Sequence, residues 1–490
     1  AEGLYTNYLG VELPVDAQIV RDQTQMLANT IKDIISPVVI RRNRIDLRLN
    51  SRYAKEVGEL SVVKPPIEMF YYLTESQSKF YDRIVSEYFS ENGIFSGAIY
   101  QPSQYEKTIE EDSLNEIDNR RYQQQRNLYD FMRRLLVKRF ESSFGAFEKS
   151  IERFINVHEV VLQFIENSNG KYILDRDLME KIYEFDSEEI DEILQRFKNE
   201  LLKRKTPKNT TVYSIDDFQS KEKFLSDINK DLELFKRIKK EISDEDLVIN
   251  DPKRDVIYTK IEDILKAEPN RKIILFTEYT DTVRHLQPYF RKKLGNKVLI
   301  CDGNVTRTLA KDLEQNFNAQ YAGTQHDNFQ VLITSDKLSE GFNLNRAGVV
   351  INYDIPWNPT RVIQRVGRIN RIGTKVFDSL YIYNFFPSEI CSSFVKSREI
   401  AEHKMFIIHN SLGEDSQIFN PKETPTASGL YSNLNKSPEE DEEAGLFTRV
   451  NNLYEEICEK HPEVIVKISK LPNRVNTAKK SSENNINVLR

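Results

Sequence analysis

Short runs of consecutive apolar residues recur through the second half of the chain, each bounded by polar residues. They lie at residues 272–277, 298–301, 331–333, 349–351 and 380–383. Runs of this length are typical of strands buried on both faces. The segments between them have helical patterns, and strands alternating with helices favour parallel pairing. We therefore predict an α/β fold for residues 256–387, with a parallel sheet covered by helices on both faces.

The preceding segment, residues 101–255, has a different pattern, since it is rich in charged residues and mostly helical. Eight apolar residues at steps of three to five predict one buried stripe: Leu128, Phe131, Leu135, Phe140, Phe144, Phe147, Ile151 and Phe154. Five cations flank this stripe: Arg126, Arg133, Arg134, Lys138 and Arg139. A patch for a phosphate backbone, a solvated face and an ion-pair surface between lobes all remain open.

The stretch from Val331 to Gly373 carries the most specific chemistry. Asn358 and Pro359 are typical of a helix start, because Asn can cap the helix and Pro tolerates its first position. Three polar residues then follow at steps of four and three and should share one face: Gln364, Arg368 and Arg371. Three apolar residues fall on the opposite face: Val362, Val366 and Ile369. Such a helix presents guanidinium groups to an anion. A lone Arg-x-x-Arg is more often a solvated face, but here a Gln and two buried strands precede it.

These residues resemble known motifs. The segment from Gln364 to Gly373 resembles motif VI (Q-x-x-G-R-x-x-R-I-G) of the superfamily 2 helicases, and Ser339 to Leu344 resembles their motif V. Tyr353-Asp354 and Trp357-Asn358-Pro359 narrow the resemblance to the Swi/Snf-like translocases of double-stranded DNA. The bacterial members include the RNA-polymerase-associated ATPase and a type fused to phospholipase-D-like nuclease domains. The resemblance implies the second RecA-like lobe of such a motor.

The resemblance also implies roles for individual residues. Arg368 and Arg371 would contact the γ-phosphate of ATP and Gln364 would orient within the same cleft, while Mg²⁺ and ATP would be held mainly by a first lobe. Gly341, Asn343 and Gly367 would also face the nucleotide. Contacts with nucleic acid are implied at eight positions: Thr277, Asp302, Gly303, Thr306, Ser335, Ser339, Trp357 and Asn358. The family's basic residue follows the Asp302 turn by a few positions. Here Arg307 comes earlier and Lys311 later, which leaves the phosphate-binding side chain open.

The phosphate cradle of such a motor is missing from the sequence. There is no G-x-x-x-x-G-K-[ST] segment, and Asp244-Glu245-Asp246 does not follow an apolar strand, as an acid that holds Mg²⁺ should. We therefore predict a helicase or translocase that hydrolyses ATP only together with the N-terminal lobe of the same protein, and no ATPase activity or metal site in this chain alone. The alternative is a non-catalytic scaffold, derived from a helicase half, that binds nucleic acid or polymerase.

Five segments are expected. Residues 1–60 would be a linker from the missing first lobe, 61–100 the start of the second lobe, 101–255 a helical insertion, 256–387 the RecA-like lobe, and 388–490 a helical tail with the start of a further domain. The chain begins with Ala rather than Met and ends at Asn-Val-Leu-Arg, so we expect a piece of a longer protein. Local basic segments include Arg41, Arg42 and Arg44 near the start and Lys396, Arg398 and Lys404 in the tail.

The composition limits how the chain can contact DNA and in which compartment it is expected to work. The 490 residues carry a formal net charge of −6, so contacts with DNA must come from local patches. Three widely spaced cysteines without metal-ligand spacing favour a reducing cytoplasm. The sequence contains no apolar stretch of 18 residues, so it predicts no membrane-spanning helix. The sequence does not indicate the oligomeric state or the DNA structure that is bound.

Overall fold

The computed structural model describes residues 59–90, 92–106, 116–168, 170–175, 210–303, 305–339, 341–356, 358, 360–371 and 375–386, with the isolated residues 30, 34, 196 and 199. Contacts divide the chain into two units, and the residues described from 59 onward belong to the unit formed by Lys55–Met405 and Ser416–Thr424. The predicted basic segment near the start, the tail at 388–490 and Trp357 lie outside the described residues.

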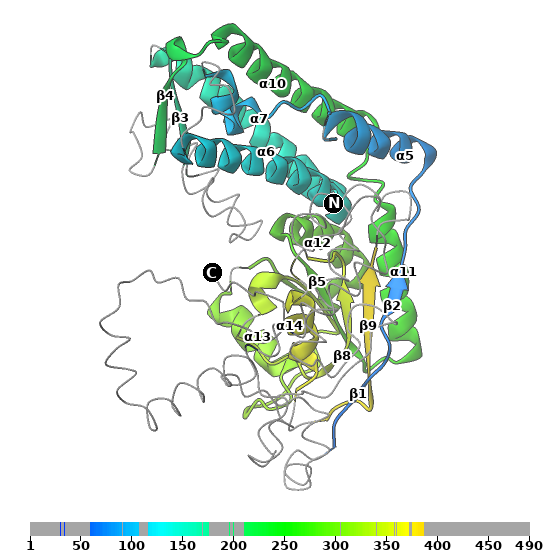
Figure 1. Ribbon diagram of the computed structural model, residues 1–490. Helices are drawn as coiled ribbons and strands as arrows, with labels where there is room; N and C mark the ends of the chain where they lie inside the picture. Colours follow the sequence, from blue (N-terminus) through cyan, green and yellow to red (C-terminus); the bar gives the residue numbers. More distant parts are fainter. Residues whose placement is uncertain are drawn as a thin grey trace, which may run out of the picture. The chain divides into compact units, whose positions relative to one another are not determined.

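A parallel sheet of seven strands forms the centre of the lobe (Figure 1). Its order is β1-β9-β8-β5-β7-β6, and β2 also pairs with β9. The strands are β1 (Val62–Val63), β2 (Ile67–Met69), β5 (Lys272–Thr277), β6 (Val298–Cys301), β7 (Val331–Ser335), β8 (Ala347–Asn352) and β9 (Ser379–Phe385). All pairs in this sheet are parallel; in the centre, Leu275 pairs with Ile333 on one side and Ile351 on the other. The predicted RecA-like fold class is confirmed.

Helices cover both faces of this sheet, because neighbouring residues of each central strand point to opposite sides. Ile273 and Leu275 of β5 share one apolar cluster with α11 (Pro252–Ala267) and α12 (Thr280–Leu294). Ile274 and Phe276 share another with α13 (Arg307–Phe317) and α14 (Thr360–Ile369). Two separate cores therefore hold the strands between layers of helices.

The insertion forms its own core. It contains α5 (Glu75–Asp82), α6 (Glu116–Ser142), α7 (Phe144–Asn167), α10 (Lys221–Asp244) and an antiparallel hairpin of β3 (Lys171–Asp175) and β4 (Thr210–Ser214). A π-helix, Arg83–Tyr88, continues α5. Short 3₁₀ helices lie at Ala98–Tyr100, Pro102–Tyr105, Ile215–Asp217, Gly295–Lys297 and Asp336–Ser339. Figure 1 shows α6, α7 and α10 side by side.

The predicted apolar stripe is buried, as expected, but it does not lie on one continuous helix. All eight of its residues are buried in one cluster. The stripe is divided between α6 and α7, because Ser143 has extended backbone angles and its side chain accepts a hydrogen bond from Ala146 N as the N-cap of α7. The same cluster includes residues from Phe80 onward, so the predicted boundary between residues 100 and 101 falls inside the insertion's core.

Two of the cations beside the stripe form ion pairs with the lobe, which was one of the three alternatives left open. Lys138 and Arg139 are buried and form ion pairs with Glu278 and Asp281 at the sheet's edge. Arg133 is also buried and donates to Phe89 O. Lys138 and Arg139 therefore form ion pairs between the insertion and the lobe, while Arg134 donates to Asp130 O of its own helix and Arg126 is exposed. Across the described residues, the helices are too short or too polar to cross a membrane.

Candidate functional site

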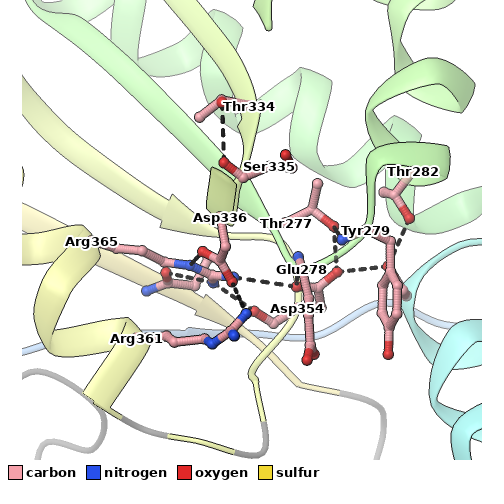
Figure 2. Close-up of polar contacts among 12 residues, drawn as sticks. Thr277, Glu278, Tyr279, Thr282, Thr334, Ser335, Asp336, Asp354, Arg361 and Arg365 are labelled. Carbon is pink, nitrogen blue, oxygen red and sulfur yellow. Dashed lines mark hydrogen bonds and ion pairs between the residues drawn. The ribbon is translucent and has the colours of Figure 1, made fainter. Parts of the chain in front are cut away.

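Polar residues follow three neighbouring strands at their carboxyl ends. Thr277 ends β5, Ser335 ends β7 with Asp336 next, and Asn352 ends β8, two residues before Asp354. Because parallel strands end at one edge of the sheet, these side chains lie close together (Figure 2). This edge is where an open α/β sheet binds ligands.

Helix α14 lies beside this edge with the predicted division of faces. The Asn358 side chain accepts hydrogen bonds from Thr360 N (3.1 Å) and Thr360 Oγ1 (2.6 Å), which caps the helix start. Gln364 is exposed and Arg368 is half-buried. On the opposite face, the three predicted apolar residues are buried: Val362, Val366 and Ile369.

The predicted position of Arg371 on this helix is wrong. Helix α14 ends at Ile369, where the Asn370 amide still bonds to Val366 O. Arg371 follows the helix end and is exposed. A seven-residue spacing places two side chains on one face only while the helix continues, so Arg371 does not share a helical face with Gln364.

A buried arginine that the sequence analysis missed anchors α14. The Arg365 guanidinium is fully buried and bonds the Asp336 carboxylate through Nε (2.6 Å) and Nη2 (2.8 Å). Its Nη1 donates to Asn352 Oδ1 and to the carbonyl of Asp354, both at 3.0 Å. Burial lowers the pKa of Arg365, but the carboxylates of Asp336, Asp354 and Glu278 together outweigh this effect, so the pKa lies above its ordinary value. Arg361 is 3.6 Å from Asp336 on its other side (Figure 2).

Asp354 joins this cluster to β5 and to the insertion. Its Oδ1 accepts from Glu278 N at 2.7 Å. Its Oδ2 accepts from Thr277 Oγ1 at 2.5 Å and from Ser142 Oγ at 2.6 Å. Its carboxylate also lies 3.7 Å from Arg365 Nη2. Asp354 therefore contacts polar groups of the sheet, of α14 and of the C-terminal end of α6.

Glu278 carries a second buried charge at the same edge. Its carboxylate lies 3.0 Å from the Lys138 ammonium of α6, and both side chains are at least nine-tenths buried. Burial raises the pKa of Glu278 above its ordinary value, although Lys138 acts in the opposite direction. Because both groups are buried, each charge depends on the other for stabilisation.

Two residues predicted to contact nucleic acid are buried instead. Thr277 is fully buried and its hydroxyl donates to Asp354. Ser335 is fully buried, and within the described part of the chain its Oγ has no hydrogen-bond partner. Contrary to the prediction, neither hydroxyl reaches the surface. The predicted strand at residues 272–277 ends at Thr277 as observed, but the pattern did not predict that its hydroxyl donates to Asp354.

Asp302 and Gly303 follow β6 where a turn was predicted. Gly303 has φ +96°, a conformation that favours glycine. Asp302 accepts from Arg284 Nε at 3.3 Å. Thr306 is exposed, and its hydroxyl caps α13 by accepting from Leu309 N at 3.2 Å. Both basic candidates, Arg307 and Lys311, are exposed on the first turns of α13.

Two predicted nucleotide-facing glycines face open space. Gly341 has φ +98°, and neither it nor Gly367 has an atom of the described residues within 4 Å of a built methyl group, apart from its own backbone surroundings. Such positions permit close approach of a ligand. Asn343 is half-buried, and Ser339 ends the 3₁₀ helix Asp336–Ser339.

The polar side chains at this edge suit the phosphate groups of ATP but do not suit Mg²⁺. Gln364, Arg368 and Arg371 are donors at or near the surface and suit phosphate oxygens. Asp336 and Asp354 are buried and bonded to Arg365 and their other partners, so they do not fit as magnesium ligands. Among the described residues, no group of three His, Cys, Asp or Glu side chains could hold a metal ion.

Comparisons with known proteins agree with this geometry. Residues 257–373 match the family model described as "Helicase conserved C-terminal domain". The uncharacterized ATP-dependent helicase YqhH of Bacillus subtilis is 34% identical over 125 residues, 26% of this chain and 20% of that protein. The RNA polymerase-associated protein RapA of Vibrio vulnificus is 31% identical over 111 residues, 23% of this chain and 11% of that protein.

More distant matches follow. Human DNA repair and recombination protein RAD54B is 28% identical over 151 residues, 31% of this chain and 16% of that protein. The alignment with the crystal structure of the C-terminal part of the Fun30 ATPase domain covers 72% of this chain and 98% of that structure, at 15% identity and a TM-score of 0.35. The matched segment spans about a fifth of YqhH and a smaller share of RapA. The predicted resemblance to the C-terminal lobe of a Swi/Snf-like helicase is confirmed, since residues 257–373 match the helicase C-terminal domain and the similar proteins include YqhH and RapA.

Proposed function

We propose that this chain is the second motor lobe of an ATP-dependent translocase of double-stranded DNA. The observation that carries the proposal is the arrangement of α14, which buries Arg365 among carboxylates while Gln364 is exposed and Arg368 is half-buried. The buried arginine fixes the helix to the sheet. Its neighbours one turn along can then meet a nucleotide that is held by the N-terminal lobe of the same protein.

Arg368 and Arg371 would act as arginine fingers in that intact protein. Positive charge beside the γ-phosphate stabilises the charge that develops during phosphoryl transfer, an effect on the order of 10³ to 10⁵ in rate for one arginine. Gln364 would orient the phosphate or the attacking water from the same face. Mg²⁺ would be held by the first lobe and the nucleotide, because the acids at this edge are already bonded to protein groups.

The turn from Asp302 to Thr306 would contact the DNA backbone. The N-terminus of α13 carries free backbone NH groups with a partial positive charge, and Arg307 and Lys311 add exposed cations there. Contacts of this kind position a duplex without reading its sequence. They suit a motor that moves along DNA of any sequence.

The test is the ATPase rate of the intact protein with saturating duplex DNA. We expect Arg368→Ala to lower kcat by about 10³-fold, as for loss of an arginine finger, with little change in the fraction of folded protein. Arg291→Ala is the matched control, because Arg291 is exposed in the last turn of α12, at the far end of the sheet. An Arg368→Ala protein with undiminished kcat would refute the proposal. DNA binding with no hydrolysis in the unmodified intact protein would instead favour a scaffold.

A further inference from the structure

The insertion is joined to the sheet's edge by polar contacts at the α6–α7 junction. Ser142, the last residue of α6, is fully buried, and its hydroxyl lies 2.6 Å from Asp354 Oδ2 and 2.8 Å from Thr282 Oγ1. Ser143 is also buried and lies 3.0 Å from the same Thr282 hydroxyl. Figure 2 shows Thr282 and Asp354 on the lobe's side of this joint.

Charged contacts surround the two serines. Lys253 of α11 donates from Nζ to the carbonyls of Glu141 (2.8 Å) and Ser142 (3.0 Å), so an ammonium of the lobe caps the C-terminus of α6. Asp281 of α12 accepts from Arg139 of α6 at 3.2 Å and from Arg153 of α7 at 2.7 Å. Buried hydrogen bonds and ion pairs have defined directions, so this joint fixes one orientation in a way that apolar contact alone does not.

The joint continues to α14 through one residue, Asp354. Asp354 takes the Ser142 hydroxyl on Oδ2, and its carbonyl accepts from Arg365 Nη1 at 3.0 Å. Arg365 lies on α14, three residues before Arg368 and therefore about one turn from it. A single residue of the lobe thus links the end of α6 to the helix that carries Arg368.

We propose that the helical insertion sets the position of α14, and that Ser142 is a positioning residue acting through Asp354 and Arg365. This role rests on the proposed function of Arg368. Without the Ser142 hydroxyl, the Asp354 carboxylate loses one of its hydrogen-bond donors and can rotate toward Arg365. The guanidinium, its partners and α14 then shift together, because a buried network rearranges as a unit.

The first test needs no enzymatic activity. Hydrogen exchange is measured on the 490-residue chain, and Ser142→Ala should raise the exchange rates of the amides from Gln364 to Ile369 by about 10-fold, because local opening becomes easier. Ser150→Ala is the matched control: Ser150 is a buried serine of α7 whose hydroxyl donates to Ala146 O of its own helix. Ser142→Thr, which keeps a hydroxyl, should restore slow exchange.

Equal exchange of these amides in the Ser142→Ala and Ser150→Ala proteins would overturn the proposal. Where Ser142→Ala does not fold, Ser142→Cys provides the same comparison, because the thiol keeps a similar volume and donates only a weak hydrogen bond.

The second test uses the intact protein and separates this proposal from the proposed function. Ser142→Ala should lower the DNA-stimulated kcat by about 10-fold to 100-fold with less than a twofold change in KM for ATP, as for misplacement of a catalytic group. In an Arg368→Ala background, measured in single turnovers, the same substitution should change the rate by less than about twofold, because the positioned group is gone.

The outcomes are distinct. If Arg368→Ala leaves kcat unchanged, the proposed function fails, and the exchange experiment still decides whether the insertion controls α14. If Arg368→Ala removes activity while Ser142→Ala does not reduce kcat, the proposed function stands and the positioning role fails. If Ser142→Ala lowers the rate by the same factor in the unmodified and the Arg368→Ala proteins, Ser142 has a purely structural role and the proposal is overturned.

Discussion

Two buried cations at the sheet's edge, Arg365 and Lys138, are held by acids from distant parts of the chain. Arg365 bonds Asp336, which lies 29 residues earlier, and Lys138 pairs with Glu278, which lies 140 residues later in the sequence. The sequence analysis had no signal for either pair, because only the folded sheet brings these residues together. A cation in a helical pattern is ordinarily solvated, and its burial becomes predictable only when its acid partner is known.

Lys138 provides the prediction at this scale. Replacing it by Met removes the ammonium and leaves the Glu278 carboxylate buried without that charge, which should lower the free energy of unfolding by about 3 to 5 kcal/mol at neutral pH. Adding Glu278→Gln to Lys138→Met should recover at least half of the loss. Denaturant unfolding of the single and double variants measures both effects, and additive losses in the double variant would contradict the ion pair.

The pH dependence of the Lys138→Met protein follows from the raised pKa of Glu278. A carboxyl group with a raised pKa holds its proton in the folded state, so the folded state binds more protons than the unfolded state at pH values above the ordinary pKa. The free energy of unfolding therefore falls as the pH rises through the raised pKa. We expect Lys138→Met to be less destabilising at pH 5 than at pH 8.

At the level of helices and strands, local sequence patterns predicted those features that depend on residues close together in the chain. The bounds of β5 and β6 agree with the predicted runs, and the apolar back of α14 is buried as expected. The end of α14 and the break at Ser143 were missed. No Gly or Pro marks either point. The break had one available signal, a five-residue step between Leu135 and Phe140 followed by a serine suited to an N-cap.

The packing of α7 against α12 gives the prediction at this scale. A methyl group at Gly145 would lie 2.5 Å from Nδ1 and 2.6 Å from Cγ of His285, whose Nε2 is held 2.9 Å from Asp251 Oδ2. Gly145→Ala should therefore separate the two helices and lower the free energy of unfolding by about 1 to 3 kcal/mol, even though Ala favours a helix.

The control for Gly145 is the same substitution made beside a smaller neighbour. In a His285→Ala background the clash is absent, so Gly145→Ala should cost nothing or stabilise the protein slightly. The measurement is the difference in unfolding midpoint between each pair of variants. An equal loss in both backgrounds would show that Gly145 is not required for contact between α7 and α12.

At the scale of the whole molecule, the lobe and its insertion share the sheet's edge. The sequence predicted a lobe that begins at residue 61 and an insertion that interrupts it. It did not predict that Ser142 of the insertion bonds Asp354, because contacts between segments that are far apart leave no periodic pattern. Gln364 and Thr306 are exposed at the lobe's surface, and Arg368 is half-buried.

The last prediction concerns what this chain does alone. Arginine fingers accelerate hydrolysis only when a nucleotide and its Mg²⁺ are held against them, and the sequence has no P-loop. The described residues also lack a metal-binding group of acids, His or Cys. We therefore expect the purified 490-residue chain to show no magnesium-dependent ATP hydrolysis above the rate of an Arg371→Ala control, with or without duplex DNA. A clear rate that Arg371→Ala abolishes would mean that the chain builds a complete nucleotide site, and the assignment of ATP to another lobe would be wrong.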